Sequence, residues 1–308
     1  MSVNLELYGP HAQPPKPFTP RQSRRYCRRL ARTHYENFTV ATWLVPRRLR
    51  QHLANIYAYC RWADDLGDDP GKGVPERLAL LKWWEQELRQ CYAGTVRHPV
   101  FIALDQTIRE FSIPIDPFLD LLVAFRQDQR VARYQTLAQL LDYCRYSANP
   151  VGRLVLYLAR CCDAERATLS DCICTGLQLA NFCQDVARDL ELGRIYLPMS
   201  ECSRAMYDES MFARREFNES FRRLLTAQVK EAEGWLRRGA PLVTRMPADL
   251  RLATALFVEG GLAILAEIRR QDYDVWTRRP TVSKIRKLRL LARCWWRLKR
   301  GKFLERLG

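Results

Sequence analysis

The stretch Asn-Ile-Tyr-Ala-Tyr-Cys-Arg-Trp-Ala-Asp-Asp-Leu-Gly-Asp-Asp, residues 55–69, joins an apolar helical pattern to a cluster of carboxylates. Asp64 and Asp68 stand four residues apart, so a helix brings both to one face, where like charges repel each other. Pro70 and Gly71 follow and predict the end of the helix. The carboxylates therefore also lie at the negative end of the helix dipole, which disfavours anions.

The same spacing recurs in Asn-Phe-Cys-Gln-Asp-Val-Ala-Arg-Asp-Leu, residues 181–190, where Asp185 and Asp189 come shortly before Gly193. One such pair is typical of a solvated helix face. Two pairs, each preceded by a helix apolar enough to be buried, instead indicate acids that line a cavity. Buried carboxylates are costly unless they are paired or bind a metal. Oxygen ligands without Cys or His point to Mg²⁺, which joins carboxylates to the phosphates of a substrate.

Helical periodicity extends over most of the chain and predicts an all-α fold. Pro and Gly residues interrupt it where helices are expected to end, and runs that alternate with period two are scarce. We expect a single domain, a bundle of helices around a central cavity in which 55–69 and 177–190 face each other. The other stretches with apolar residues at three-and-four spacing are 75–93, 100–111, 117–129, 136–146, 169–192, 210–238, 249–273 and 283–299.

Composition divides the 308 residues into three segments. Four prolines between residues 14 and 20 predict an extended, loosely held leader over 1–20. Residues 21–277 form the helical domain. Residues 278–308 form a basic amphipathic C-terminal segment. The leader lacks the apolar core of a signal peptide. The sequence also contains no run of about 18 apolar residues, the length needed to span a bilayer. We therefore expect a cytoplasmic protein, with 278–308 as a peripheral contact to the inner face of the membrane.

The net charge of +16 is concentrated at two places, 278–306 with twelve Lys/Arg and one Glu, and 21–50 with nine Arg and one Glu. Basic patches of this kind can bind nucleic acid. The C-terminal patch is also amphipathic, a pattern typical of a helix lying in an anionic membrane surface. The alternative is a terminal helix that packs on the protein body with a solvated basic face. The predicted apolar stripe is Ile285, Leu288, Leu291, Trp295 and Leu298, with Trp296 beside it.

These motifs, taken together over residues 22–275, resemble the squalene and phytoene synthases, head-to-head isoprenoid synthases with an all-α fold. The first aspartate motif of that family, with its preceding Tyr and Arg, is similar to Tyr57-Ala-Tyr-Cys-Arg61-x2-Asp64-x3-Asp68. The second is similar to Asn181-x3-Asp185-x3-Asp189 followed by Gly-Arg-Ile-Tyr-Leu-Pro, residues 193–198. Further matching segments are His34-Tyr35-x-Asn37-Phe38, Arg133-Tyr134, Tyr143-Cys144 and Pro150-Val151-Gly152.

The resemblance implies a role for each matching position. It implies Mg²⁺ ligands at Asp64, Asp68, Asn181, Asp185 and Asp189. It implies contacts with a substrate diphosphate from Arg61, Tyr35 and Asn37. The chain departs from the family at Gln184, where relatives carry Arg, and at Arg188, where they carry Glu, so that Arg188 would offer the positive charge about one helical turn later. Aromatic rings that could stabilise a carbocation are those of Tyr57, Tyr143 and Phe182. The alternative for Tyr143 and Phe182 is an ordinary position in the core. We expect Tyr196 to pack beside the second motif without a part in the chemistry. Asn149 would bring a polar group to an otherwise apolar cleft.

Three runs, 34–41, 147–152 and 181–186, most resemble the bacterial hydroxysqualene synthases of hopanoid biosynthesis. That branch implies a carbon–oxygen lyase that ionises presqualene diphosphate with Mg²⁺ and captures the carbocation with water, without NADPH and without nucleic acid. Within the family the alternative is a prenyltransferase that forms presqualene diphosphate, squalene or a phytoene-type product from farnesyl or another prenyl diphosphate. The remote alternative is a non-catalytic basic helical protein that binds membranes or nucleic acid, which leaves both aspartate pairs unexplained.

Overall fold

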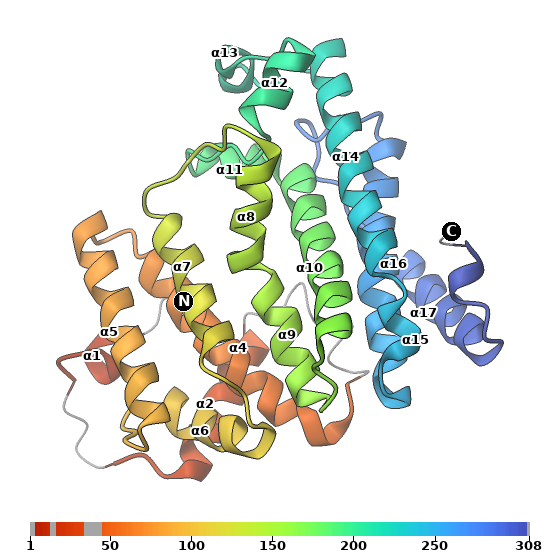
Figure 1. Ribbon diagram of the computed structural model, residues 1–308. Coiled ribbons are helices and arrows are strands. Elements are labelled where there is room, and N and C mark those ends of the chain that lie inside the picture. The colour runs from red at the N-terminus through yellow and green to blue at the C-terminus, as the bar shows by residue number, and fades with distance from the viewer. Residues whose placement is uncertain (1–3, 13–16, 34–44, 307–308) are drawn as a thin grey trace. The chain divides into compact units, whose positions relative to one another are not determined.

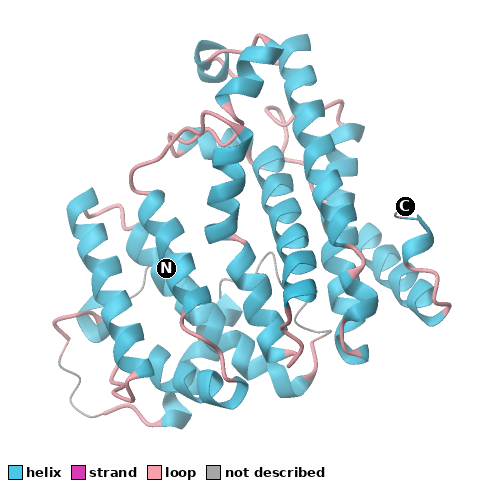
Figure 2. Cartoon of the chain, viewed as in Figure 1, coloured by secondary structure: helices cyan, strands magenta, loops and turns pink. Residues whose placement is uncertain are grey.

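The computed structural model of the protein describes residues 4–12, 17–33 and 45–306 (Figure 1). Within these residues the secondary structure is helical, and the one extended pairing is an isolated parallel bridge between Arg133 and Ile195 (Figure 2). The all-α fold predicted from periodicity is confirmed. By its internal contacts the chain forms two compact units, Met1–Arg130 with Arg153–Cys161, and Val131–Gly152 with Cys162–Gly308.

Unit 1 is organised around α4 (Arg47–Gly67), which contacts α2, α5, α6 and α7. Tyr59 and Trp62 of α4 are fully buried. The Trp62 ring stacks on Trp84 with centroids 5.2 Å apart, and the Tyr59 hydroxyl donates to the carbonyl oxygen of Phe118 at 2.9 Å. The other helices of this unit are α1 (Leu5–Tyr8), α2 (Pro20–Thr33), α5 (Val74–Tyr92), α6 (Pro99–Phe111) and α7 (Asp116–Gln127), and α9 (Asn149–Leu158) enters it at Arg153.

Unit 2 is built on α10 (Ala164–Gln184), which packs closely against α14 (Glu219–Gly239) and also contacts α16 (Ala248–Arg270). Small residues permit the close approach, because a Cβ atom at Gly176 would lie 2.8 Å from the backbone nitrogen of Leu236. A Cβ at Gly239 would lie 2.7 Å from the carbonyl oxygen of Leu169. The remaining helices are α8 (Leu137–Ser147), α11 (Val186–Glu191), α12 (Met199–Ala205), α13 (Glu209–Ala213), α15 (Leu242–Arg245), α17 (Lys284–Lys299) and the 3₁₀ turn Leu304–Arg306.

Two of the predicted long helices are interrupted. The stretch 169–192 ends as α10 at Gln184 and resumes as α11, with Asp185 between them in a non-helical conformation. The stretch 210–238 contains α13, a turn in which Arg215 has φ +51°, and then α14. Periodicity continues across both breaks because helices that share one buried face keep their apolar residues in phase.

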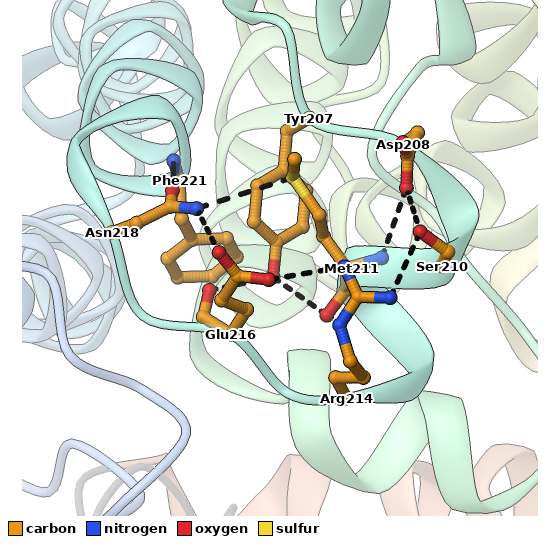
Figure 3. A network of polar contacts seen from close by, with 8 residues as sticks. All are labelled: Tyr207, Asp208, Ser210, Met211, Arg214, Glu216, Asn218 and Phe221. Carbon is orange, nitrogen blue, oxygen red and sulfur yellow. Dashed lines mark hydrogen bonds and ion pairs between the residues drawn. The ribbon is translucent and has the colours of Figure 1, made fainter.

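Side-chain caps explain the second break (Figure 3). Asp208 accepts a hydrogen bond from the Met211 backbone nitrogen at 3.0 Å and begins α13, while Asn218 accepts from the Phe221 nitrogen at 2.9 Å and begins α14. Between them the Tyr207 hydroxyl donates to the carbonyl oxygen of Glu216 at 2.8 Å. Asp and Asn are favoured N-cap residues, so they start new helices here instead of continuing one.

Both ends of the described chain contain helical segments. Within the proposed leader 1–20, Leu5–Tyr8 forms a helical turn, and the Tyr8 ring lies 5.0 Å from that of Tyr26. The C-terminal segment forms α17, which packs on α16. In the described part of the chain no helix meets the length and apolarity that crossing a membrane requires.

Candidate active site

The first aspartate motif lies at the C-terminal end of α4, as its sequence predicts. Asp64 occupies the last turn, and Asp68 is the residue that ends the helix, its backbone nitrogen donating to the Asp64 carbonyl oxygen at 2.9 Å. This hydrogen bond keeps the two aspartates one turn apart. The side chain of Gln129 donates to the Gly67 carbonyl oxygen at 2.9 Å and holds the helix end in place.

Arg61 supplies the positive charge of this helix end. Its guanidinium donates to the Asp64 carboxylate at 2.9 Å and also forms an ion pair with Asp65, whose side chain is only 7% exposed. The Asp65 carboxylate is a contact that the sequence analysis missed. Its signal was present, because Asp65 follows Arg61 by four residues, a spacing at which helical side chains meet.

Electrostatic strain remains in this cluster in spite of Arg61. The pKa of Asp64 is raised to about 6. Burial is the largest cause and the charge of Asp68 the next, with smaller contributions from Asp65 and Asp128, while Arg61 lowers the pKa in part. A carboxyl that is surrounded by carboxylates gains from a nearby cation, since the cation favours its charged form.

The second aspartate motif spans the junction of α10 and α11. Asp185 is the residue between the two helices, yet the Asp189 nitrogen donates to the Asp185 carbonyl oxygen at 2.9 Å, which preserves the one-turn spacing. The Asn181 side chain donates to the Asp185 carboxylate at 2.8 Å. Gly193, at φ +73°, then turns the chain away, a conformation that glycine adopts without strain.

The counter-charge of the second motif comes from a distant part of the sequence. Arg279, in the connection between α16 and α17, holds the Asp185 carboxylate with two nitrogens, one of them at 2.9 Å. The buried amide of Gln184 donates to the carbonyl oxygen of Pro280 at 2.6 Å and fixes the same connection. Sequence reasoning missed Arg279, because no local spacing links two residues 94 positions apart.

The second pair shows the same strain as the first. Burial, followed by the charge of Asp185, raises the pKa of Asp189 to about 7, and Arg194, Arg188 and Arg279 lower it only in part. Arg188 itself is exposed on α11. The motif thus collects several guanidinium groups around two carboxylates, an arrangement suited to an anionic ligand with cations attached.

An aromatic cluster packs beside the second motif. Phe182 stacks on Tyr196 with centroids 4.0 Å apart and planes at 11°, which confirms the expected packing of Tyr196. The ring centroids of Tyr143 and Tyr134 lie 5.8 Å and 5.9 Å, respectively, from that of Tyr196. Tyr143 and Phe182 are 4% and 5% exposed, so both belong to the core of unit 2. Their role toward a carbocation stays a prediction.

The remaining predicted site residues fall into different surroundings. Asn149 is buried at the start of α9, where its side-chain oxygen accepts a hydrogen bond from the Thr175 hydroxyl at 3.0 Å. Tyr57 is half-buried on α4, one turn before Arg61. Tyr35 and Asn37 lie outside the described residues. The expectation that the two aspartate pairs face each other across a cavity joins residues of both units and stays a prediction.

Both pairs have the chemistry that Mg²⁺ requires. Each offers two carboxylates one helical turn apart, without sulfur or imidazole, and in each burial, followed by the repulsion between the two carboxylates, raises the pKa of one of them. Mg²⁺ takes one or two protein carboxylates and completes its shell with water and phosphate oxygens. In the described ranges no group of three or more His, Cys, Asp or Glu side chains is already arranged to hold a metal ion. The residues that would hold the cation are Asp64, Asp68, Asn181, Asp185 and Asp189.

Comparison with known proteins agrees with the family resemblance of the sequence. A family model described as squalene/phytoene synthase matches residues 31–286. The phytoene synthase of Arthrospira platensis is 30% identical over 290 residues, which are 89% of this chain and 93% of that enzyme. The chloroplastic phytoene synthase 3 of Zea mays is 30% identical over 277 residues, 88% of this chain, but the chain spans only 65% of its length.

Solved structures extend the agreement to the fold. The squalene synthase HpnC from Alicyclobacillus acidocaldarius is 45% identical, with a TM-score of 0.79 over 82% of this chain and 95% of that one. A dehydrosqualene synthase solved with a ligand is 27% identical, with a TM-score of 0.82 over 91% and 98%. The predicted isoprenoid-synthase-type fold is therefore confirmed. The chain belongs to the squalene/phytoene synthase family, whose members act on prenyl diphosphates.

Proposed function

We propose that this protein is a hydroxysqualene synthase of squalene and hopanoid biosynthesis, acting in the cytoplasm. In the reaction the carbon–oxygen bond of presqualene diphosphate breaks, and its electron pair leaves with the diphosphate. The oxygen of a water molecule then forms a new bond to the rearranged carbocation, and the water's proton passes to solvent or to the released diphosphate. The products are hydroxysqualene and diphosphate, and no reductant is consumed.

The observation that carries the proposal is the 45% identity with a squalene synthase over nearly the whole of that structure, well above the 30% shared with the phytoene synthases. It supports a squalene-type substrate over a phytoene-type one. The runs 34–41, 147–152 and 181–186, which resemble hydroxysqualene synthases, favour water over hydride as the group that captures the carbocation.

The carboxylates serve to bind the cation that makes diphosphate a good leaving group. Bound Mg²⁺ would act as a Lewis acid and neutralise the departing charge. Asp64 and Asp185 are each held in position by an arginine, Arg61 and Arg279, so the carboxylates are oriented before any ligand arrives. The guanidinium groups of Arg61 and Arg188 can donate charge-assisted hydrogen bonds to phosphate oxygens.

Aromatic side chains supply a water-poor surface for the carbocation. We assign this role to Tyr143 and Phe182 of the buried aromatic cluster, and to Tyr57 of α4, because the face of an aromatic ring attracts a cation. The hydroxyl of Tyr143 and the amide of Asn149 add polarity to this part of unit 2. Water must be admitted to the carbocation at one point only, since a wet surface would capture it at several carbons.

A product assay tests the proposal. The purified protein is given presqualene diphosphate and Mg²⁺, with and without NADPH, and the products are separated by chromatography. We expect hydroxysqualene in equal amounts with and without NADPH. Squalene that appears only with NADPH, or no turnover in either mixture, would contradict the proposal.

A second candidate function has an observation of its own, the 30% identity with phytoene synthases over 89% of the chain. A prenyltransferase of this kind would condense two prenyl diphosphates. The same assay with farnesyl diphosphate, or with a longer prenyl diphosphate, separates the two functions. Consumption of these substrates together with inertness toward presqualene diphosphate would assign the chain to the condensing branch.

A further inference from the structure

The inner face of α17 is held to α16 by arginines. Arg286 forms an ion pair with Glu267, whose side chain is 1% exposed. Arg293 and Arg297 both pair with Glu259, whose side chain is 6% exposed, at 2.6 and 3.4 Å. A buried carboxylate that loses its counter-charge is strongly destabilised, so these pairs fix which side of α17 faces the protein.

The outer face of α17 is apolar. Ile285 and Leu288 are 64% and 67% exposed, and Trp295 and Trp296 are each 48% exposed. These positions, together with Ala292, recur at three-and-four spacing and therefore form one stripe along the helix. Leu291 and Leu298, predicted from sequence to share this stripe, are half-buried on the other side.

An ordinary surface helix buries its apolar stripe and exposes its charges. In α17, Arg286, Arg293 and Arg297 pair with Glu259 and Glu267, while Ile285, Leu288, Trp295 and Trp296 stay exposed. Large apolar residues scattered singly over a surface need no explanation, but a continuous stripe marks a contact site. The exposed stripe Ile285, Leu288, Trp295 and Trp296 is therefore a candidate contact surface.

Positive charge surrounds the stripe. The Lys299 ammonium lies 4.2 Å from the centre of the Trp295 ring, and the Arg300 guanidinium lies 3.5 Å from that of Trp296. Residues 278–306 contain twelve Lys/Arg and a single acid, Glu305. The exposed basic residues along and after the helix are Lys284, Lys287, Arg289, Lys299, Arg300 and Lys302.

We propose that the outer face of α17 lies on an anionic phospholipid surface, such as the inner face of the membrane. Tryptophan and aliphatic residues enter the boundary between headgroups and acyl chains, while lysine and arginine attract the lipid phosphates. Charge complementarity selects this partner, because a nucleic acid would use the basic residues but would leave Ile285 and Leu288 exposed to water. The inference goes beyond the proposed reaction and depends only on α17, although a membrane contact would suit an enzyme with an apolar product.

Vesicle cosedimentation of the full chain tests the proposal. One set of vesicles mixes phosphatidylcholine with phosphatidylglycerol, and a second contains phosphatidylcholine alone. The variant Leu288→Gln/Trp296→Gln removes apolar contacts without touching Arg286, Arg293 or Arg297. The matched control, Val123→Gln/Met206→Gln, changes Val123 of α7, which is 40% exposed, and Met206 directly after α12, which is 69% exposed.

We expect the wild-type chain to bind the anionic vesicles. The Leu288→Gln/Trp296→Gln variant should bind them at least about tenfold more weakly, because each of its two substitutions removes apolar surface that would be buried in the interface. The control should bind like the wild type. A second variant, Lys287→Gln/Arg289→Gln, should lose about fivefold per charge on anionic vesicles. Turnover of detergent-dispersed presqualene diphosphate should be unchanged in all variants. A lack of turnover in the wild type would contradict the proposed function but would leave the result of the vesicle assay unaffected.

Three results would overturn the proposal. The first is equal binding of the wild type and the Leu288→Gln/Trp296→Gln variant, with circular dichroism showing both folded. The second is equal binding of the wild type to neutral and anionic vesicles. The third is a wild-type dimer, measured by light scattering, that this variant disrupts while neither protein binds vesicles. That result would assign the stripe to contact between two copies of the chain.

Discussion

The two aspartate motifs have the same spacing but obtain their counter-charges in different ways. At the end of α4, Asp64 is paired with Arg61, three residues earlier on the same helix. At the junction of α10 and α11, Asp185 is paired with Arg279, which stands 94 residues later. One motif is therefore complete within a single helix turn, and the other is complete only when the connection between α16 and α17 is in place.

Each motif contains one carboxyl whose pKa is raised. In the first motif the paired aspartate, Asp64, still has its pKa raised to about 6, and its side chain is 43% exposed. In the second, Arg279 holds Asp185, whose side chain is 13% exposed, and the pKa of Asp189 rises to about 7. The guanidinium of Arg61 is shared between Asp64 and Asp65, whereas both hydrogen bonds of Arg279 go to Asp185.

The largest expected effect comes from removing one carboxylate of either motif. We expect Asp64→Asn and Asp185→Asn each to lower turnover of the prenyl diphosphate by about a thousandfold, or about 4 kcal/mol in the barrier, because each removes a ligand of the cation that stabilises the leaving group. Steady-state rates at several Mg²⁺ concentrations measure the loss. The matched control is Asp142→Asn, which changes an exposed aspartate on α8.

If both motifs serve the reaction, both variants fail and the control does not. An Asp185→Asn protein that is folded and fully active would show that only the local motif of α4 is catalytic. The comparison between the motifs would then be one of function as well as of structure.

A smaller effect separates local from distant pairing. We expect Arg61→Gln and Arg279→Gln each to lower the free energy of unfolding by about 1–3 kcal/mol, since each leaves a poorly exposed carboxylate without its charged partner. Hydrogen exchange should distinguish them. Arg279→Gln should speed exchange in residues 276–283, and Arg61→Gln should speed it only in the last turns of α4. Equal loosening of 276–283 by both variants would refute the distinction.

The smallest effect is on the pH dependence of stability without metal. Asp64 and Asp189 have pKa values of about 6 and about 7 in the folded protein, above the ordinary value of 3.8. A carboxyl of this kind binds protons more tightly when folded, so its stabilising contribution is present at low pH and is lost as the pH rises through the folded pKa. In EDTA the free energy of unfolding should therefore fall between about pH 4, near the unfolded pKa, and about pH 7, near the higher of the two folded pKa values.

Urea denaturation at a series of pH values measures this slope, and the variant Asp64→Asn/Asp189→Asn should flatten it. Mg²⁺ should act most strongly at the upper end of the range, because it competes with protons for the same carboxylates. An unchanged slope in the double variant would mean that other groups control the titration.

Prediction from sequence succeeded where contacts are local. The helix end at Asp64 and Asp68 followed from an apolar pattern and from Pro70-Gly71, and the structure places α4 accordingly. It failed where a side chain starts a new helix inside a continuous pattern, as Asn218 does before α14. It also failed for Arg279, since a pairing across 94 residues leaves no periodic signal.

The C-terminal helix gives the clearest division between the two kinds of information. The sequence by itself determined that 284–299 is an amphipathic basic helix, because spacing and charge are local properties of the chain. Only the tertiary structure decided that Arg293 and Arg297 turn toward Glu259 while Trp295 and Trp296 face outward. The reason is physical: a buried carboxylate on α16 must have a partner, and that requirement outweighs the burial of an apolar stripe.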